Sequence, residues 1–200
     1  MSILDKTIAA VTPPESDESR AKARADARAA AQPGDWLSLV LDHHLKIEAA
    51  FAAVKAAGDA ASRTGALKKL GAVLTGHSIA EEGVIYPALA QADEKAHADM
   101  AYTEQAAAKM QMAALENLAP MSQDFLDKLE HIRGAVAHHV FEEEGKWFLE
   151  LKEKASADVQ AKLTQRYKQE FDRYMGPDAA GERSGAPVEP RTWTAPPPAI

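Results

Sequence analysis

The chain has 200 residues, which is enough for one domain with appendages and a sizeable hydrophobic core. Its formal net charge is −7 and no Lys/Arg cluster is interleaved with aromatic residues, which argues against nucleic acid as a partner. It contains no cysteine, so disulfides, thiolate zinc sites and iron–sulfur clusters are excluded and any metal must be held by nitrogen and oxygen.

The composition favours an all-α protein outside the membrane. The chain is rich in Ala, Leu, Glu and Lys, and strand signals are absent. No apolar run approaches the roughly 18 residues of a membrane span. Asp5 and Lys6 also interrupt the place where a signal peptide needs an apolar core. We therefore expect a cytoplasmic protein with no membrane partner.

The first 34 residues are interpreted as an N-terminal extension. The TPPE motif at 12–15 has the pattern of an N-cap followed by proline at the first helical position. It predicts a polar helix from about residue 13 to Gln32. The charges of this helix are scattered around its circumference, so we expect it to dock loosely or to contact a protein partner.

Residues 35–155 are expected to form a four-helix bundle. Four periodic segments span about 36–57, 64–90, 93–119 and 122–155, and Asp35 can cap the first of them. The connections between the segments are short, which forces consecutive helices to run antiparallel. The sequence therefore predicts an up-down-up-down bundle.

The last 45 residues are expected to lie outside the bundle. Ser156 begins a further amphipathic segment, which predicts a C-terminal helix over 156–175. Residues 176–200 are rich in proline and are expected to form a disordered tail.

A doubled motif carries the functional signal. HSIAEEG at 77–83 is repeated in outline as HVFEEEG at 139–145. Residues four apart share one face of a helix, so His77 with Glu81 and His139 with Glu143 each present an imidazole beside a carboxylate. A single His-x3-Glu is usually only an exposed pair, but two copies on facing helices are typical of a dinuclear metal site.

A third histidine lies in the apolar seam of the first bundle segment. His44 falls between Val40 and Ile47 in a stripe of apolar residues, whereas His43 lies to one side and is expected to support a ligand or an interface. In the last segment the stripe favours His139 and Glu143 over the alternative of His138 and Glu142. Unpartnered imidazoles and carboxylates in a core cost several kcal/mol each, and a metal would compensate that cost.

The third bundle segment leaves two alternatives open. One stripe of small and apolar residues (Ala98, Ala101, Ala108, Met112 and Leu115) turns Gln105 inward, and a second turns Glu104 inward. Because an anionic oxygen is the better ligand for a hard divalent cation, we predict Glu104 as the ligand. Counted along antiparallel helices, the predicted ligands fall at nearly one level. Glu82 and Glu144 are expected to orient ligating imidazoles or to face water.

Three stretches together resemble the bacterial hemerythrin-like HHE cation-binding domain family. They are LDHHLKIEAAF, HSIAEEGVIYPAL and HVFEEEGKWFLEL, and the resemblance covers about residues 36–152. It implies a non-heme centre of two iron ions inside the bundle, with terminal histidines and with Glu81 and Glu143 able to bridge. Manganese or zinc would suit the same ligand types. The chain departs from the family pattern at Glu104-Gln105, where Glu-His is usual.

The predicted metal ligands are His44, His77, Glu81, Glu104, His139 and Glu143. The leading hypothesis is a diiron binding protein that binds or senses O2 or a related small oxidant, or that holds iron. The first alternative is a diiron oxidase, peroxidase or NO-reducing enzyme. The second is a helical interaction module without metal.

Overall fold

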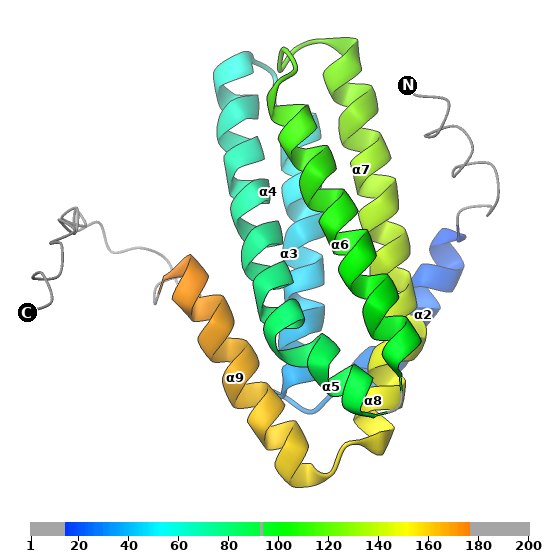
Figure 1. The fold of residues 1–200 in the computed structure, drawn as a ribbon. Helices are drawn as coiled ribbons and strands as arrows, with labels where there is room; N and C mark the ends of the chain where they lie inside the picture. Colours follow the sequence, from blue (N-terminus) through cyan, green and yellow to red (C-terminus); the bar gives the residue numbers. More distant parts are fainter. Residues whose placement is uncertain (1–14, 93, 177–200) are drawn as a thin grey trace, which may run out of the picture.

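The protein is described by a computed structural model that covers residues 15–92 and 94–176. Within these ranges the chain is helical and has no strand, which confirms the all-α prediction. Four long helices lie side by side, and their connections lie at alternate ends of the bundle (Figure 1). They are α3 (Trp36–Ala56), α4 (Ala60–Ala80), α6 (Lys95–Glu116) and α7 (Gln123–Glu142).

Two of the predicted helices are each interrupted by a π-helical turn. After α4 follow η1 (Glu81–Ile85) and α5 (Tyr86–Gln91), and after α7 follow η2 (Glu143–Trp147) and α8 (Phe148–Lys154). Each π-helix begins at the first glutamate of a His-x3-Glu-Glu-Gly motif. The interruption was not predicted, because one wider turn barely changes the apolar periodicity of the segment.

Side-chain caps fix where the helices begin. The carboxylate of Asp35 accepts a hydrogen bond from the backbone of Ser38, as predicted. Asp59 caps α4 in the same way, so this helix begins at Ala60 and not near residue 64. Helix α6 is also shorter than the predicted 93–119, and position 93 itself lies outside the described residues.

Helix α2 (Asp17–Ala30) lies against the bundle near η2, α3 and α8. The predicted start near residue 13 was wrong, because Ser16 is the N-cap; the TPP part of the TPPE motif lies outside the described residues. The predicted end at Gln32 was also too late. Two alanines, Ala23 and Ala27, are buried and form the apolar face that the charge pattern obscured.

Helix α9 (Ala157–Met175, orange in Figure 1) packs along α4 and α3. Its N-cap is Ser156, as predicted, and it ends close to the predicted residue 175. Leu163, Tyr167 and Phe171 form its buried face. The predicted disordered tail lies almost entirely outside the described residues.

The hydrophobic core consists of two clusters. One lies toward the end of the bundle that carries α5, α8 and α9, and it contains Leu41 and Ala80. The other contains Ile47 and Val73 and fills the opposite half of the bundle. On α3 and α4 the change from one cluster to the other falls at His44 and His77, so a polar layer separates the two apolar clusters.

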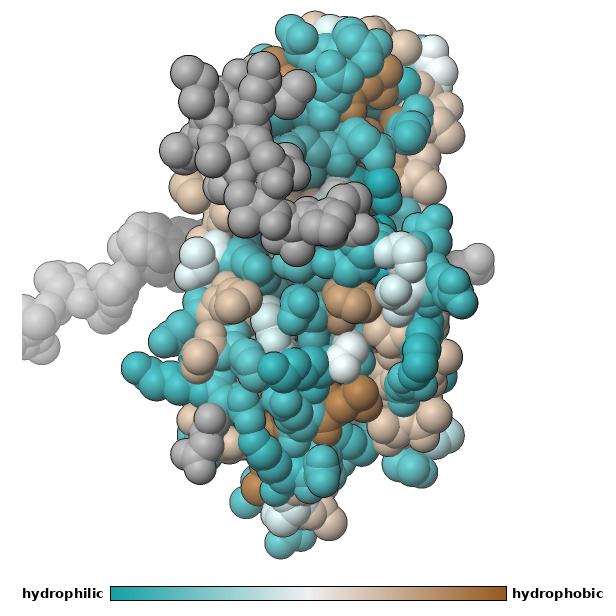
Figure 2. Space-filling view, turned by 90° about the vertical axis from the view of Figure 1, so that its right-hand side faces the viewer, coloured by the Kyte–Doolittle hydropathy of each residue, from teal (hydrophilic) through white to brown (hydrophobic). Residues whose placement is uncertain are grey.

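The side of the molecule where α2 and α7 lie is mostly hydrophilic, with small apolar patches between polar side chains (Figure 2). Among the described helices, none contains an apolar stretch long enough to cross a lipid bilayer.

Candidate metal centre

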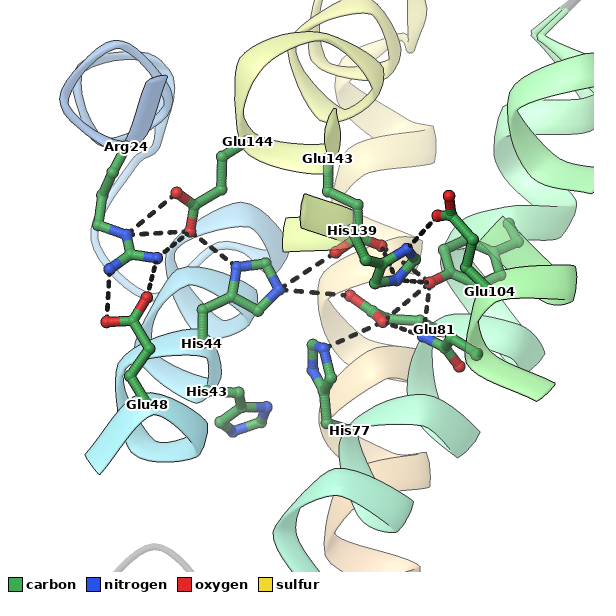
Figure 3. A network of polar contacts seen from close by, with 12 residues as sticks. Arg24, His43, His44, Glu48, His77, Glu81, Glu104, His139, Glu143 and Glu144 are labelled. Atoms are coloured by element: carbon green, nitrogen blue, oxygen red, sulfur yellow. Dashed lines mark hydrogen bonds and ion pairs between the residues drawn. The ribbon is translucent and has the colours of Figure 1, made fainter. Parts of the chain in front are cut away.

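Three imidazoles and two carboxylates from five elements (α3, α4, η1, α7 and η2) meet between the two apolar clusters (Figure 3). His77 Nε2 lies 3.1 Å from Glu81 Oε2, and His139 Nε2 lies 3.3 Å from Glu143 Oε1. His44 joins the two motifs, because its Nε2 lies 3.3 Å from Glu143 Oε2 and 3.8 Å from Glu81 Oε1. All five side chains are buried.

The π-helical turns place the two motif carboxylates in register. In each copy the residue five positions after the glutamate closes the wide turn, Tyr86 on Glu81 and Phe148 on Glu143. The Phe148 ring stacks over the imidazole of His44, with ring centroids 6.3 Å apart. The duplicated sequence motif therefore corresponds to a duplicated backbone geometry.

Three atoms at the centre of this cluster that could bind a metal have no hydrogen-bond partner. They are Nε2 of His44, Oε1 of Glu81 and Oε2 of Glu143. Ligand atoms of these residues and of His77 lie within 4.8 Å of one another. Buried polar atoms without partners are costly, and a cation between them would satisfy all of them. The donor set of the cluster therefore fits a metal ion.

The negative charge of the cluster raises the pKa values of several of its own groups, so that these groups hold protons more strongly. Burial raises the pKa of Glu81, and the nearby Glu143 carboxylate raises it further, to about 7. Burial alone would lower the pKa of His139, but Glu143 and Glu104 outweigh it and raise that pKa to about 10. The carboxylates around His44 likewise raise its pKa well above the usual value. Excess negative charge at the centre thus favours bound positive charge.

Each of the three imidazoles also makes a hydrogen bond through Nδ1, the ring nitrogen that faces away from the cluster centre. The Nδ1 atom of His44 lies 2.8 Å from Glu144 Oε1, and Arg24 of α2 donates to the same carboxylate. The Nδ1 atom of His77 lies 3.2 Å from the Tyr167 hydroxyl. Hydrogen bonds of this kind fix the tautomer of an imidazole and turn its Nε2 toward a metal. The predicted orienting role of Glu144 agrees with these contacts.

A family model supplies the identification. The model of the hemerythrin HHE cation binding domain matches residues 37–151, more than half of the chain. The chain belongs to this family. Comparison with curated proteins and with solved structures gave no match. The matched HHE residues contain α3 to α8, whereas α2 and α9, which supply Arg24 and Tyr167, lie outside them.

The third long helix of the HHE domain brings Gln105 into the cluster. Gln105 is buried and donates through Nε2 to Glu81 Oε2 at 2.6 Å. Glu104 lies outside the cluster, where its Oε2 is 2.8 Å from Nδ1 of His139. The inward position predicted for Glu104 is therefore occupied by Gln105, because α6 turns its stripe of alanines toward the core. Glu104 instead orients His139.

Sequence reasoning missed the tyrosine at the centre of the HHE cluster. The Tyr86 hydroxyl lies 2.8 Å from Glu143 Oε1 and 3.1 Å from both Glu81 Oε2 and His139 Nε2. Burial raises its pKa well above the usual value, so the phenol keeps its proton. The repeated aromatic positions after the two motif glycines were the signal that could have identified it.

The remaining candidate histidines of the HHE chain lie outside the cluster. His43 stacks on Phe171 and lies 2.8 Å from the Tyr167 hydroxyl, which agrees with its predicted supporting position. His138 contacts Glu15. His97 is partly buried and stacks on Trp147.

Glu82 is turned away from the cluster. Its carboxylate accepts a hydrogen bond from Lys109, and its backbone carbonyl accepts one from the Tyr102 hydroxyl. The two second glutamates of the motifs therefore differ: Glu144 contacts an imidazole of the cluster, and Glu82 takes the alternative position near the surface.

Proposed function

We propose that the buried cluster holds two iron ions and that the protein binds or senses O2 or a related small oxidant, or stores iron. The proposal is supported most directly by three buried atoms, one each of His44, Glu81 and Glu143, that lack a hydrogen-bond partner. Membership of a cation-binding family points to the same role. Imidazole and carboxylate ligands suit iron, and also manganese and zinc.

The five residues divide into two overlapping donor sets. His44, His77, Glu81 and Glu143 would hold the first ion. His139 would hold the second together with the same two carboxylates, beside the Tyr86 hydroxyl. Glu81 and Glu143 would thus serve both ions. When bound, iron in such a site supplies one-electron redox chemistry toward small oxidants.

The protein's own groups would control protons at the centre. The Tyr86 hydroxyl lies within hydrogen-bond distance of Glu143 Oε1, and Gln105 Nε2 donates to the Tyr86 oxygen at 2.5 Å. Tyr86 therefore donates a hydrogen bond to the Glu143 carboxylate, while Gln105 holds the phenol in place. Both side chains are buried, which limits their contact with water.

Anaerobic titration with Fe(II) of protein made metal-free by a chelator (the chelated protein) tests the proposal. We expect saturation at about two ions per chain and a new visible absorption band on exposure to air. His77→Ala should weaken uptake, whereas His131→Ala, which alters an exposed histidine of α7, should leave it unchanged. The absence of saturable uptake would reject the proposal and would favour a helical interaction module.

A second candidate is a diiron oxidase, peroxidase or NO-reducing enzyme. The buried Tyr86 phenol favours it, because a hydroxyl in contact with three groups of the cluster can donate a hydrogen bond to a molecule that reacts there. Turnover of peroxide or NO by the iron-loaded protein, lost in Tyr86→Phe with iron uptake retained, would support an enzyme. Stable stoichiometric O2 binding without turnover would oppose it.

A further inference from the structure

A cavity of about 390 Å³ lies directly beside the metal centre, between α4, α6 and α7. It reaches from His77 and His139 of the cluster to the outer surface at Ala107 and Ala135. Its volume lies within the range of pockets that bind small organic molecules, and it is larger than a diatomic gas requires.

The shape of the cavity follows from the sequence of α6 and α7. The side chains at its mouth are small: Ala107 and Ala108 line it from α6, and Ala135 lines it from α7. Deeper in, the walls are formed by Leu74 and Ile132 together with other aliphatic side chains. An apolar cavity of this kind is filled more favourably by an apolar ligand than by water.

One buried polar atom gives the cavity a specific recognition point. Gln105 lines the cavity and is only 4% exposed. Its Nε2 donates to the Glu81 carboxylate and to the Tyr86 oxygen, and because a carboxylate only accepts, the amide orientation is fixed and Oε1 is left as an acceptor. This Oε1 has no hydrogen-bond partner, and neither has Oε1 of Gln111 further along α6. A hydrogen-bond donor in the cavity would satisfy the Gln105 oxygen.

The charges of the lining determine the ligand's charge class. Among the described residues around the cavity there is no Lys or Arg, and Glu104 is the sole carboxylate. An anion would find no Lys or Arg there, the His139 imidazole is already paired with Glu104 and Glu143, and Glu104 would repel the anion. A cation would leave most of its charge against aliphatic walls. The lining therefore favours a neutral molecule.

We propose that this cavity binds a neutral, largely apolar organic molecule whose hydroxyl group donates a hydrogen bond to Oε1 of Gln105. The hydroxyl end then lies beside the cluster, and the apolar part lies between α6 and α7. Gln105 stands where the family pattern has histidine, so the departure at this position creates the recognition point. That the ligand is a substrate or effector of the metal centre rests on the proposed function, whereas its binding does not require metal.

Binding is tested by NMR on the chelated protein with three probes of one skeleton: benzyl alcohol, toluene and benzoate. We expect benzyl alcohol to saturate and to shift the methyl signals of Leu74, Ile132 and Val136, while those of Val54 and Leu151 stay unchanged. Toluene, without the donor, should bind at least about fivefold more weakly. Benzoate should bind more weakly still, because of its charge.

A matched pair of variants tests the location. Ala107→Phe places a large ring at the mouth of the cavity, and Ala106→Phe places the same ring on an adjacent exposed position that does not line it. We expect at least tenfold weaker binding of benzyl alcohol to the first variant and unchanged binding to the second.

Three results would overturn the inference: no saturable binding of benzyl alcohol, equal affinity for toluene, or equal loss in both variants. Because the protein is chelated in these measurements, they are independent of the iron titration. Loss of iron uptake with retained benzyl alcohol binding would reject the proposed function alone. Iron uptake without benzyl alcohol binding would reject the proposed cavity ligand alone.

Discussion

The Tyr167 hydroxyl lies between two imidazoles, 2.8 Å from Nδ1 of His43 and 3.2 Å from Nδ1 of His77. Burial lowers the pKa of His43 to about 3, so its imidazole is neutral and can accept a hydrogen bond. If Tyr167 donates to His43, its oxygen accepts from the Nδ1–H of His77. The His77 Nε2 lone pair is then directed toward the cluster, as a metal ligand requires.

Replacing Tyr167 by phenylalanine removes this hydroxyl and keeps the buried ring. We expect the dissociation constant for Co(II) or Fe(II) to rise about tenfold, because His77 is no longer held in one tautomer. Titration followed by the Co(II) absorption spectrum measures both the affinity and the ligand geometry. Tyr174→Phe, on an exposed tyrosine of the same helix, is the control. Equal affinities of the two variants would show that the hydroxyl has no positioning role.

The choice between Glu104 and Gln105 shows what the sequence could and could not predict at this scale. The stripe of Ala98, Ala101 and Met112 pointed Gln105 inward, and in the structure this stripe is buried. The preference for a charged ligand led to Glu104 instead. Periodicity allowed either side chain, and the preference for a charged ligand, which describes only what a metal would favour, selected the one that lies outside the cluster.

At the scale of single elements, the apolar stripes predicted where the long helices lie and which side chains they turn inward. His44, His77 and His139 are all buried in the positions that their stripes gave them. The π-helical turns were not predictable from the same periodicity. Their effect is local but important, since the wide turn is what brings Tyr86 into contact with Glu81.

Helix α2 offers a test of how closely an added element is packed. Ala27 is completely buried, whereas Ala29 on the same helix is exposed. Ala27→Leu should therefore lower the free energy of unfolding by about 1–3 kcal/mol through overpacking. Ala29→Leu should change it little. Denaturant unfolding of both variants provides the comparison, and equal stabilities would mean that α2 is not held tightly in solution.

Asp35 connects α3 to α8, because it caps the first helix and pairs with Lys152 of the second. Burial tends to raise its pKa, but Lys152 and two backbone N–H groups outweigh burial and lower the pKa below the usual 3.8. A lowered pKa in the folded protein stabilises it above pH 3.8, and this contribution is lost as the pH falls through the folded-state pKa.

Asp35→Asn keeps a capping oxygen and removes only the charge. We expect the variant to be less stable than the parent by about 1 kcal/mol at pH 6. The difference should shrink as the pH is lowered toward 3, because the parent then loses the same charge. Urea unfolding at a series of pH values measures it. A difference that stays constant with pH would contradict the ion pair.

At the scale of the whole molecule, the centre extends beyond the matched family domain. Arg24 of α2 supports His44 through Glu144, and Tyr167 of α9 supports His77. The sequence predicted both helices but gave no sign of these contacts, because they join residues far apart in the chain and follow no local period. Helices α2 and α9, which the sequence placed outside the bundle, therefore complete the surroundings of the cluster.

The central claim is that the buried cluster exists to hold cations, and thermal unfolding with and without metal tests it most directly. A ligand that binds only the folded protein stabilises it, by about 2.7 kcal/mol at a hundredfold excess over its dissociation constant. For a chain of this size that corresponds to a rise in Tm of at least about 5 °C. We predict such a rise on adding Fe(II) to the chelated protein under anaerobic conditions, and its reversal by chelator. Identical melting temperatures in both states would contradict the account.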